Sequence, residues 1–207
     1  MISTNAKTIN LLAVSGSLRK TSSNRNILLA AAELAPEYVS YTIYEDLETL
    51  PPFNPDKEEG DEAVRQWRQR VKDADGILIC TPEYAFGVPG ALKNALDWLV
   101  SSGELNDKPV AAISASPLPA GGDKALASLL WTLKALGTRM TIPASAMNTI
   151  CHPGTDTNPN PILNLNAFSI PAAGKKINER GELTDPATRQ QLGTLLEALT
   201  DSITNPH

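Results

Sequence analysis

Short apolar runs alternate with longer segments of helical periodicity, and this alternation constrains the fold more than any other feature of the chain. The runs lie at residues 9–14, 39–44, 76–80 and 109–115, and they are rich in Val, Ile, Leu, Ala and Tyr. Short apolar strands separated by helical patterns are typical of βαβ units, in which helices cover a parallel sheet. The sequence therefore predicts an α/β fold.

The helical segments carry Leu, Ile, Val or Trp at intervals of three and four residues. Their predicted bounds are 26–34, 61–72, 91–100, 124–136 and 186–199. Asp185 and Pro186 suit the N-cap and first position of the last helix, and Gly137 suits a left-handed C-cap after the fourth. The segment Arg139–Pro143 is the predicted fifth strand.

With 207 residues the chain is expected to form one domain, residues 1–207, with an irregular excursion at about 148–183. That excursion contains several prolines and asparagines and no sustained periodicity. We expect it to be a surface loop, an arm that clasps a partner subunit, or a functional segment. A short edge strand formed by Leu163, Leu165, Phe168 and Ile170 is an alternative for part of it.

Charge, histidine and cysteine content exclude several classes of function. A net charge of -5 without a basic cluster disfavours nucleic acid. No apolar run approaches the roughly 20 residues that span a bilayer, so no membrane partner is expected. Two histidines and two cysteines leave no metal site and no serine-hydrolase base. The few cysteines, and the lack of a secretory signal at the start of the sequence, predict a cytoplasmic location.

Ligands of open parallel sheets bind at the carboxyl ends of the strands, so the loops there are the candidate sites. The first, Ser15–Asn24, is dense in hydroxyl groups and leads directly into a helix. Helix N-terminal amides, hydroxyl groups and the Arg19 guanidinium together suit a phosphate dianion. The alternative is that these Ser and Asn residues only cap the helix.

Two further loops complete the candidate cleft. Thr81–Gly90 presents Tyr84, Phe86 and a rigid Pro/Gly backbone, which suits a flat heterocycle, and Ser114–Asp123 supplies a second wall. The alternative is an ordinary turn whose aromatic side chains fill the core. A phosphate loop beside a planar-ring site is typical of a mononucleotide site. The sequence lacks G-x-G-x-x-G after the first strand, which disfavours a dinucleotide site. It also lacks G-x-x-x-x-G-K-[ST] throughout, which disfavours a nucleoside-triphosphate site.

The motifs Gly16-Ser17-Leu18-Arg19 and Pro82-Glu83-Tyr84, followed by Pro89 to Trp98, resemble the NADPH-dependent FMN reductase family of quinone, chromate and azo-dye reductases. The resemblance covers about residues 8–142 and resumes near 181–199. It implies a flavodoxin-like three-layer sandwich, with a five-stranded parallel sheet of order 2-1-3-4-5 and helices on both faces.

The resemblance also implies FMN as the cofactor and assigns its contacts. The residues implied to hold the phosphate are Ser17, Arg19, Ser22 and Asn24; those lining the ring are Pro82, Glu83, Tyr84, Ala85 and Phe86; those of the third loop are Ser116 and Gly121. Where the family usually has Asn and then a small residue, this chain has Ala85 and Phe86, and Pro117 and Leu118 stand where glycines are common.

The implied function is an oxidoreductase that transfers hydride from NADPH or NADH through flavin N5 to a small electron acceptor such as a flavin or quinone. The flavin carries the chemistry, so no side chain is predicted to be catalytic. The implied assembly is a homodimer or homotetramer. Alternatives are a flavodoxin-type electron carrier that does not oxidise NAD(P)H, and a scaffold that has lost FMN.

Overall fold

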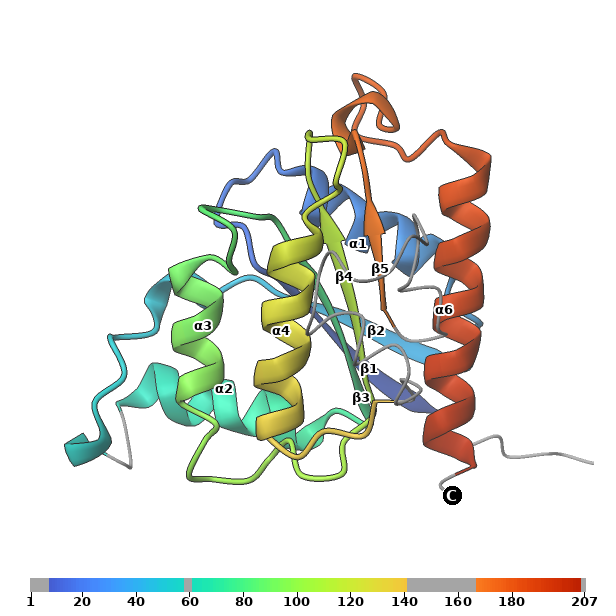
Figure 1. Ribbon diagram of the computed structural model, residues 1–207. Helices are drawn as coiled ribbons and strands as arrows, with labels where there is room; N and C mark the ends of the chain where they lie inside the picture. The colour runs from blue at the N-terminus through green and yellow to red at the C-terminus, as the bar shows by residue number, and fades with distance from the viewer. Residues whose placement is uncertain (1–7, 58–60, 141–166, 206–207) are drawn as a thin grey trace, which may run out of the picture.

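The computed structural model describes residues 8–57, 61–140 and 167–205, which form three layers with a parallel sheet in the middle (Figure 1). The strand order is β2-β1-β3-β4-β5, and every neighbouring pair runs parallel. This is the predicted flavodoxin-like order. The bounds of the strands are β1 (Ile9–Ser15), β2 (Val39–Tyr44), β3 (Gly76–Thr81), β4 (Val110–Ala115) and β5 (Ala167–Ile170).

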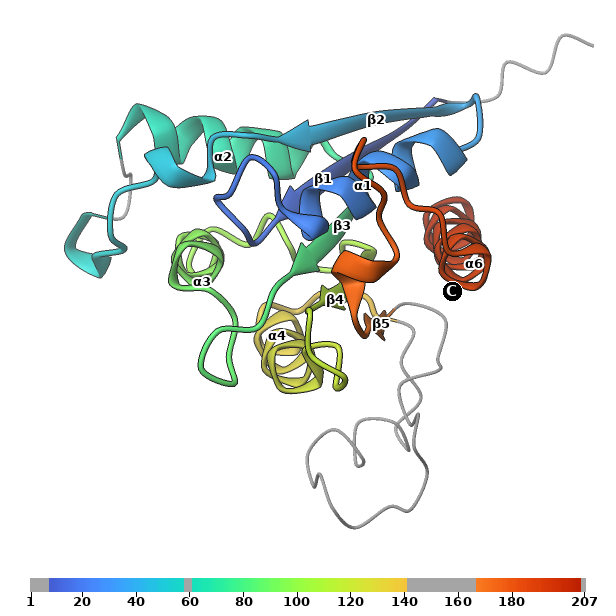
Figure 2. The same cartoon turned by 90° about the horizontal axis from the view of Figure 1, so that it is seen from above.

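Five α-helices of the described chain cover both faces of the sheet, and Figure 2 views the layers from above. One face carries α2 (Glu62–Asp73), α3 (Gly90–Asp97) and α4 (Asp123–Ala135), and the other carries α1 (Ser23–Leu34) and α6 (Pro186–Thr204). Three short 3-10 helices lie at η1 (Leu47–Thr49), η2 (Pro55–Lys57) and η3 (Ala173–Lys175).

Alternation along the strands divides the core into two. In β1, Leu12 and Val14 pack with α2, α3 and α4, whereas Leu11 and Ala13 pack with α1 and α6. All residues of β3 and β4 are buried because helices cover both faces, which explains their continuous apolar sequence. Strand β2 lies at the sheet edge, as its alternating pattern predicts.

Two predicted helix ends are confirmed. Asp185 is the N-cap of α6, its side chain accepts a hydrogen bond from the Thr188 amide, and Pro186 is the first helical residue. Gly137 follows α4 with a φ of 70°, the left-handed conformation that glycine adopts without steric cost. Local capping chemistry was therefore readable from the sequence.

The predicted fifth strand at Arg139–Pro143 is wrong where the chain is described. Arg139 forms only an isolated bridge with Pro109, and residues 141–143 lie outside the described residues. The position beside β4 is taken by Ala167–Ile170, whose Phe168 and Ile170 are buried against the α1 and α6 side. A strand there must fill that core, which an Arg-and-Pro-containing segment does poorly.

The predicted irregular excursion at about 148–183 has regular structure where it is described. From residue 167 it contains β5, which confirms the alternative of a short edge strand there, then η3 and an isolated antiparallel bridge between Ile177 and Leu183; residues 148–166 lie outside the described residues. No described helix has the length and apolar character needed to cross a membrane. The parallel strands bring the loops after β1, β3 and β4 to one end of the sheet (Figure 1).

Candidate functional site

The first loop begins at Gly16, where its backbone lies in close contact with β3. The Gly16 amide donates to the Cys80 carbonyl over 2.8 Å, and a Cβ on Gly16 would lie 2.9 Å from Thr81 Oγ1 and 3.0 Å from Leu92 Cδ2. A side chain at this position would therefore push the loop away from the sheet. Glycine allows the following residues to turn back over the end of β1.

Serine hydroxyl groups shape the loop from within. The Ser17 amide donates to Ser15 Oγ over 3.2 Å, the Arg19 amide donates to Ser17 Oγ over 3.3 Å, and Ser22 Oγ caps α1 by accepting from the Asn24 amide over 3.1 Å. Ser22 is thus a helix cap, in agreement with the alternative that Ser and Asn residues of this loop cap the helix. This capping leaves other backbone amides of the loop without a hydrogen-bond acceptor in the described part of the chain.

Several backbone amides of the first loop remain available to a ligand. Across the described chain, no hydrogen bond engages the amides of Leu18, Lys20, Thr21 or Ser22. Arg19 and Lys20 are exposed and form no ion pair with any other described residue, whereas Arg25 pairs with Glu45 at 2.9 Å. Unengaged amides beside two cations that lack an ion-pair partner in the described chain make this loop a candidate site for an anion.

Asn24 ties the strand ends together beneath the loop. Its side chain is buried, with Nδ2 donating to the Ala115 carbonyl over 3.3 Å and Oδ1 accepting from the Cys80 thiol over 3.2 Å. Burial raises the pKa of that thiol, so Cys80 stays protonated and keeps the hydrogen bond. Asn24 therefore holds β3 and β4 in place, and its predicted contact with phosphate stays a prediction.

The second loop is a tight hairpin with an unusual sequence. Tyr84 and Gly87 exchange two backbone hydrogen bonds of 3.0 Å, and the residues between them, Ala85 and Phe86, have φ values of 49° and 60°. Positive φ at both central residues is typical of a type I′ turn, which favours Asn-Gly. Ala and Phe are strained there, because Cβ crowds the backbone at positive φ.

The aromatic side chains of this hairpin point to solvent. Tyr84 is 53% exposed and Phe86 is 77% exposed. The alternative in which they fill the core is therefore wrong. Pro82 is buried at the base of the loop, so Tyr84, Ala85 and Phe86 are the predicted ring-lining residues that a ligand can reach directly.

Glu83 links the second loop to the third. One oxygen of its carboxylate accepts a hydrogen bond of 3.0 Å from the Ala125 amide in the first turn of α4. The N-cap of that helix is Gly122, which has a φ of 85° and no side chain to offer. Glu83 supplies the missing capping oxygen from a distant part of the chain.

The third loop is held by two residues that the resemblance assigned to the cofactor. Ser116 is buried, and its Oγ accepts from the Leu118 amide over 3.2 Å. Gly121 has a φ of 66°, and a Cβ there would lie 2.9 Å from the Pro171 nitrogen. Both residues have structural roles that the sequence did not reveal, and their contacts with a cofactor stay predictions.

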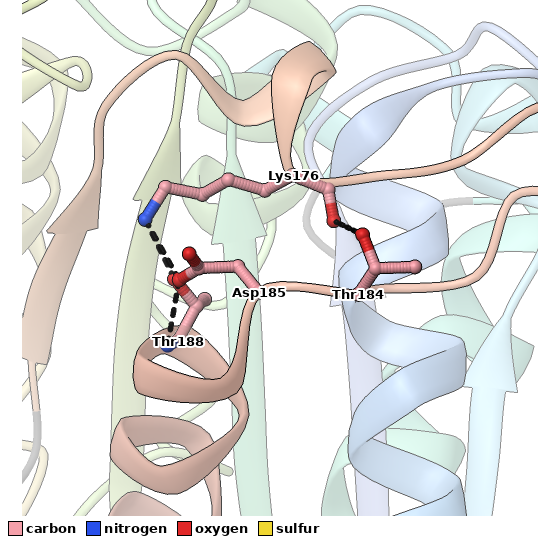
Figure 3. Close-up of polar contacts among 4 residues, drawn as sticks. All are labelled: Lys176, Thr184, Asp185 and Thr188. Atoms are coloured by element: carbon pink, nitrogen blue, oxygen red, sulfur yellow. Dashed lines mark hydrogen bonds and ion pairs between the residues drawn. The ribbon is translucent and has the colours of Figure 1, made fainter.

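A small polar cluster joins the segment after β5 to the start of α6 (Figure 3). Lys176 Nζ lies 3.1 Å from Asp185 Oδ2 and 2.8 Å from Thr188 Oγ1, and Thr184 Oγ1 donates to the Lys176 carbonyl over 3.2 Å. Hydrogen bonds from Thr188 and then from Lys176 lower the pKa of Asp185 to about 2. The cluster anchors the chain entering α6.

The three loops thus place a candidate anion site beside exposed apolar side chains. Leu18 and Leu118, to which the sequence assigned no contact, are 51% and 56% exposed in the first and third loops. Large apolar residues within otherwise polar or Pro/Gly-rich loops were the signal that could have identified them. Among the described residues, no group of three His, Cys, Asp or Glu side chains is placed to hold a metal.

Comparisons with known proteins agree on one family. A family model described as NADPH-dependent FMN reductase matches residues 9–149. The chain is 34% identical to an NADPH:quinone oxidoreductase from Arabidopsis thaliana, over 92% of this chain and 90% of that protein. It is 40% identical to a quinone reductase from Pseudomonas putida, over 53% of this chain and 61% of that protein. Among solved structures, the flavoenzyme NAD(P)H:(acceptor) oxidoreductase FerB from Paracoccus denitrificans superposes with a TM-score of 0.72 at 26% identity, covering 95% of this chain and 97% of that one.

Proposed function

The chain belongs to the NADPH-dependent FMN reductase family, and from that premise we propose that its three loops hold FMN and a quinone acceptor. The protein is an NAD(P)H-dependent flavin oxidoreductase. The observation that carries the site assignment is the set of unengaged amides at Leu18, Lys20, Thr21 and Ser22 beside unpaired Arg19.

The first loop fits the phosphate of FMN. A dianion there accepts from the available amides and from the guanidinium of Arg19, and Ser17 Oγ adds a polar contact. Ser22 and Asn24 support the site from beneath, Ser22 as cap of α1 and Asn24 as tie between β3 and β4. Their direct contact with the phosphate is part of the proposal.

The second and third loops fit the ring. Tyr84, Ala85 and Phe86 offer an exposed backbone and aromatic surface, while Pro82 and Glu83 fix the base of that hairpin. Ser116 and Gly121 bring the third loop alongside. Bound FMN supplies two-electron redox chemistry, and the protein contributes position, donors and exclusion of water.

The overall reaction converts NAD(P)H, a proton and a quinone into NAD(P)⁺ and a hydroquinone. Relatives named as NADPH:quinone oxidoreductase and quinone reductase support this acceptor class. They disfavour the alternative of a flavodoxin-type carrier, which does not oxidise NAD(P)H.

Steady-state kinetics test this function. If both substrates use the same face of the ring in turn, double-reciprocal plots of NADPH consumption at several quinone concentrations will be parallel. Intersecting lines would contradict this shared position, and the absence of quinone-dependent NADPH consumption would contradict the function itself.

We also propose a cytoplasmic location and self-association. A buried, free thiol at Cys80 is compatible with a reducing compartment. Val100 after α3 and Trp131 on α4 are large apolar side chains that are exposed, and this apolar surface supports a homodimer or homotetramer. Sedimentation analysis tests the assembly, because Trp131→Glu should then shift the protein to a smaller species.

A further inference from the structure

Exposed apolar side chains are concentrated at the candidate site. Of the large hydrophobic residues that are exposed in the described chain, four belong to its three loops: Leu18, Tyr84, Phe86 and Leu118. Phe86, at 77%, is the most exposed of all of them. Apolar side chains gathered at one end of a sheet are typical of a surface that binds an apolar partner.

The backbone of Phe86 is strained. Its φ of 60° is costly for a bulky residue, and the hairpin would be relaxed by glycine at the same position. The exposed ring gains little packing from the protein in return. Backbone strain that is not offset by packing is found mainly at functional sites. There, the strained residue often presents its side chain to a ligand.

The segments around Phe86 also lack charge. Residues 84–90 and 117–122 contain no Asp, Glu, Lys or Arg, and Glu83 at the base is engaged with the Ala125 amide. A polyanionic acceptor such as a metal oxyanion finds no counter-charge in these segments. A neutral, flat and apolar acceptor can stack on the exposed Phe86 ring, and Leu118 adds an exposed aliphatic side chain in the third loop.

We propose that Phe86, supported by Tyr84 and Leu118, determines acceptor specificity by stacking a neutral fused-ring quinone at the mouth of the site. This inference rests on the proposed function and names its substrate class. The quinone gains two electrons and two protons to become a hydroquinone; NAD(P)H supplies both electrons and one proton as hydride, and water supplies the other proton. Phe86 takes no part in the electron or proton balance and only positions the acceptor.

Rapid mixing of the holoenzyme separates this proposal from the function on which it rests. FMN-loaded protein is first reduced anaerobically with NADPH and then mixed with 2-methyl-1,4-naphthoquinone or with ferricyanide, a charged acceptor that needs no stacking surface. The variants are Phe86→Gly, which removes the ring and relaxes the turn, and Phe86→Tyr, which keeps the ring. Tyr38→Ser is the control, because Tyr38 is a 44% exposed aromatic at the opposite, amino-terminal end of β2.

For Phe86→Gly we expect the second-order rate with the naphthoquinone to fall about tenfold relative to ferricyanide, the scale of one lost aromatic contact plus apolar area. Phe86→Tyr and Tyr38→Ser should keep the wild-type ratio. An unchanged ratio in Phe86→Gly, or the same loss in Tyr38→Ser, would overturn the specificity role while leaving the function intact. Failure of NADPH to reduce the wild-type flavin would instead overturn the proposed function.

Discussion

The carboxylate of Glu83 accepts a hydrogen bond of 3.0 Å from the backbone amide of Ala125, although 42 positions separate the two residues in the chain. The amide is one of the unsatisfied donors in the first turn of α4, and Gly122 at the N-cap has no side chain to reach it. One acidic residue thereby fixes the loop after β3 against the helix that follows the loop after β4. The relative position of two walls of the site depends on this contact.

Removal of the Glu83 carboxylate should weaken both stability and cofactor binding. Loss of an N-cap acceptor costs about 0.5–2 kcal/mol, so we expect Glu83→Ala to lower the free energy of unfolding by that amount. FMN affinity should fall as well, because the two walls become less well positioned. Denaturant unfolding and FMN titration measure the two effects.

The control is Glu83→Gln, which keeps an oxygen acceptor of the same reach. It should retain most of the stability and affinity. Equal loss in Glu83→Gln and Glu83→Ala would mean that negative charge, and not the capping oxygen, is what the site requires.

Arg19 should contribute directly to FMN affinity. Its side chain is exposed and makes no hydrogen bond or ion pair within the described part of the chain, so its substitution removes no such contact there. Loss of a charge-assisted hydrogen bond costs about 1.5–3 kcal/mol, so Arg19→Ala should raise the Kd for FMN by roughly 10- to 150-fold. Titration of flavin fluorescence measures it, with Arg70→Ala on α2 as the matched control. Wild-type affinity in Arg19→Ala would remove this residue from the phosphate site.

Backbone strain in the hairpin at Ala85 and Phe86 should lower the free energy of unfolding. Their φ values of 49° and 60° suit Asn-Gly, so the double variant Ala85→Asn/Phe86→Gly should be more stable than wild type by about 1–2 kcal/mol. Little apolar burial is lost, because Phe86 is mostly exposed. Equilibrium unfolding in guanidinium checks this. A less stable double variant would show that the turn is not strained in solution.

Asp185 should make the fold sensitive to acid. Hydrogen bonds from Thr188 and Lys176 lower its folded pKa to about 2, whereas an unfolded aspartate titrates near about 3.9. A depressed folded pKa stabilises the protein above the unfolded value, and that contribution is lost as the pH falls from about 4 towards about 2. Asp185→Asn keeps a capping oxygen without the charge.

The difference in denaturation midpoint between wild type and Asp185→Asn isolates this residue from the other carboxylates. The difference should be constant between pH 7 and pH 5 and should shrink as the pH falls through that window. A difference that does not change with pH would contradict the assigned role of Asp185.

Features governed by local chemistry were predictable from the sequence. The apolar runs became β1, β3 and β4 within one residue at each end, and Asp185 and Gly137 mark helix ends as expected. The fifth strand was misplaced because its position depends on which segment fills the core beside β4. Phe168 and Ile170 fill it; the sequence offered a short edge strand there only as an alternative, and a local pattern does not show which segment pairs with β4.

The meeting of the three loops was predictable from the sequence, and the contacts of their residues were less so. The loops after β1, β3 and β4 do gather at one end, as parallel topology requires. The contacts of Asn24 with Cys80 and of Glu83 with Ala125 join residues far apart in sequence, so residue type alone could not separate support from ligand contact. The strain at Phe86 depends on backbone angles that a sequence does not state.

An absorbance spectrum of the purified protein loaded with FMN, recorded anaerobically before and after NADPH is added, tests the proposed function. We expect FMN to bind, NADPH to bleach its visible absorbance, and a quinone to restore that absorbance. Protein that does not bind FMN, or bound FMN that stays oxidised in the presence of NADPH, would contradict this function.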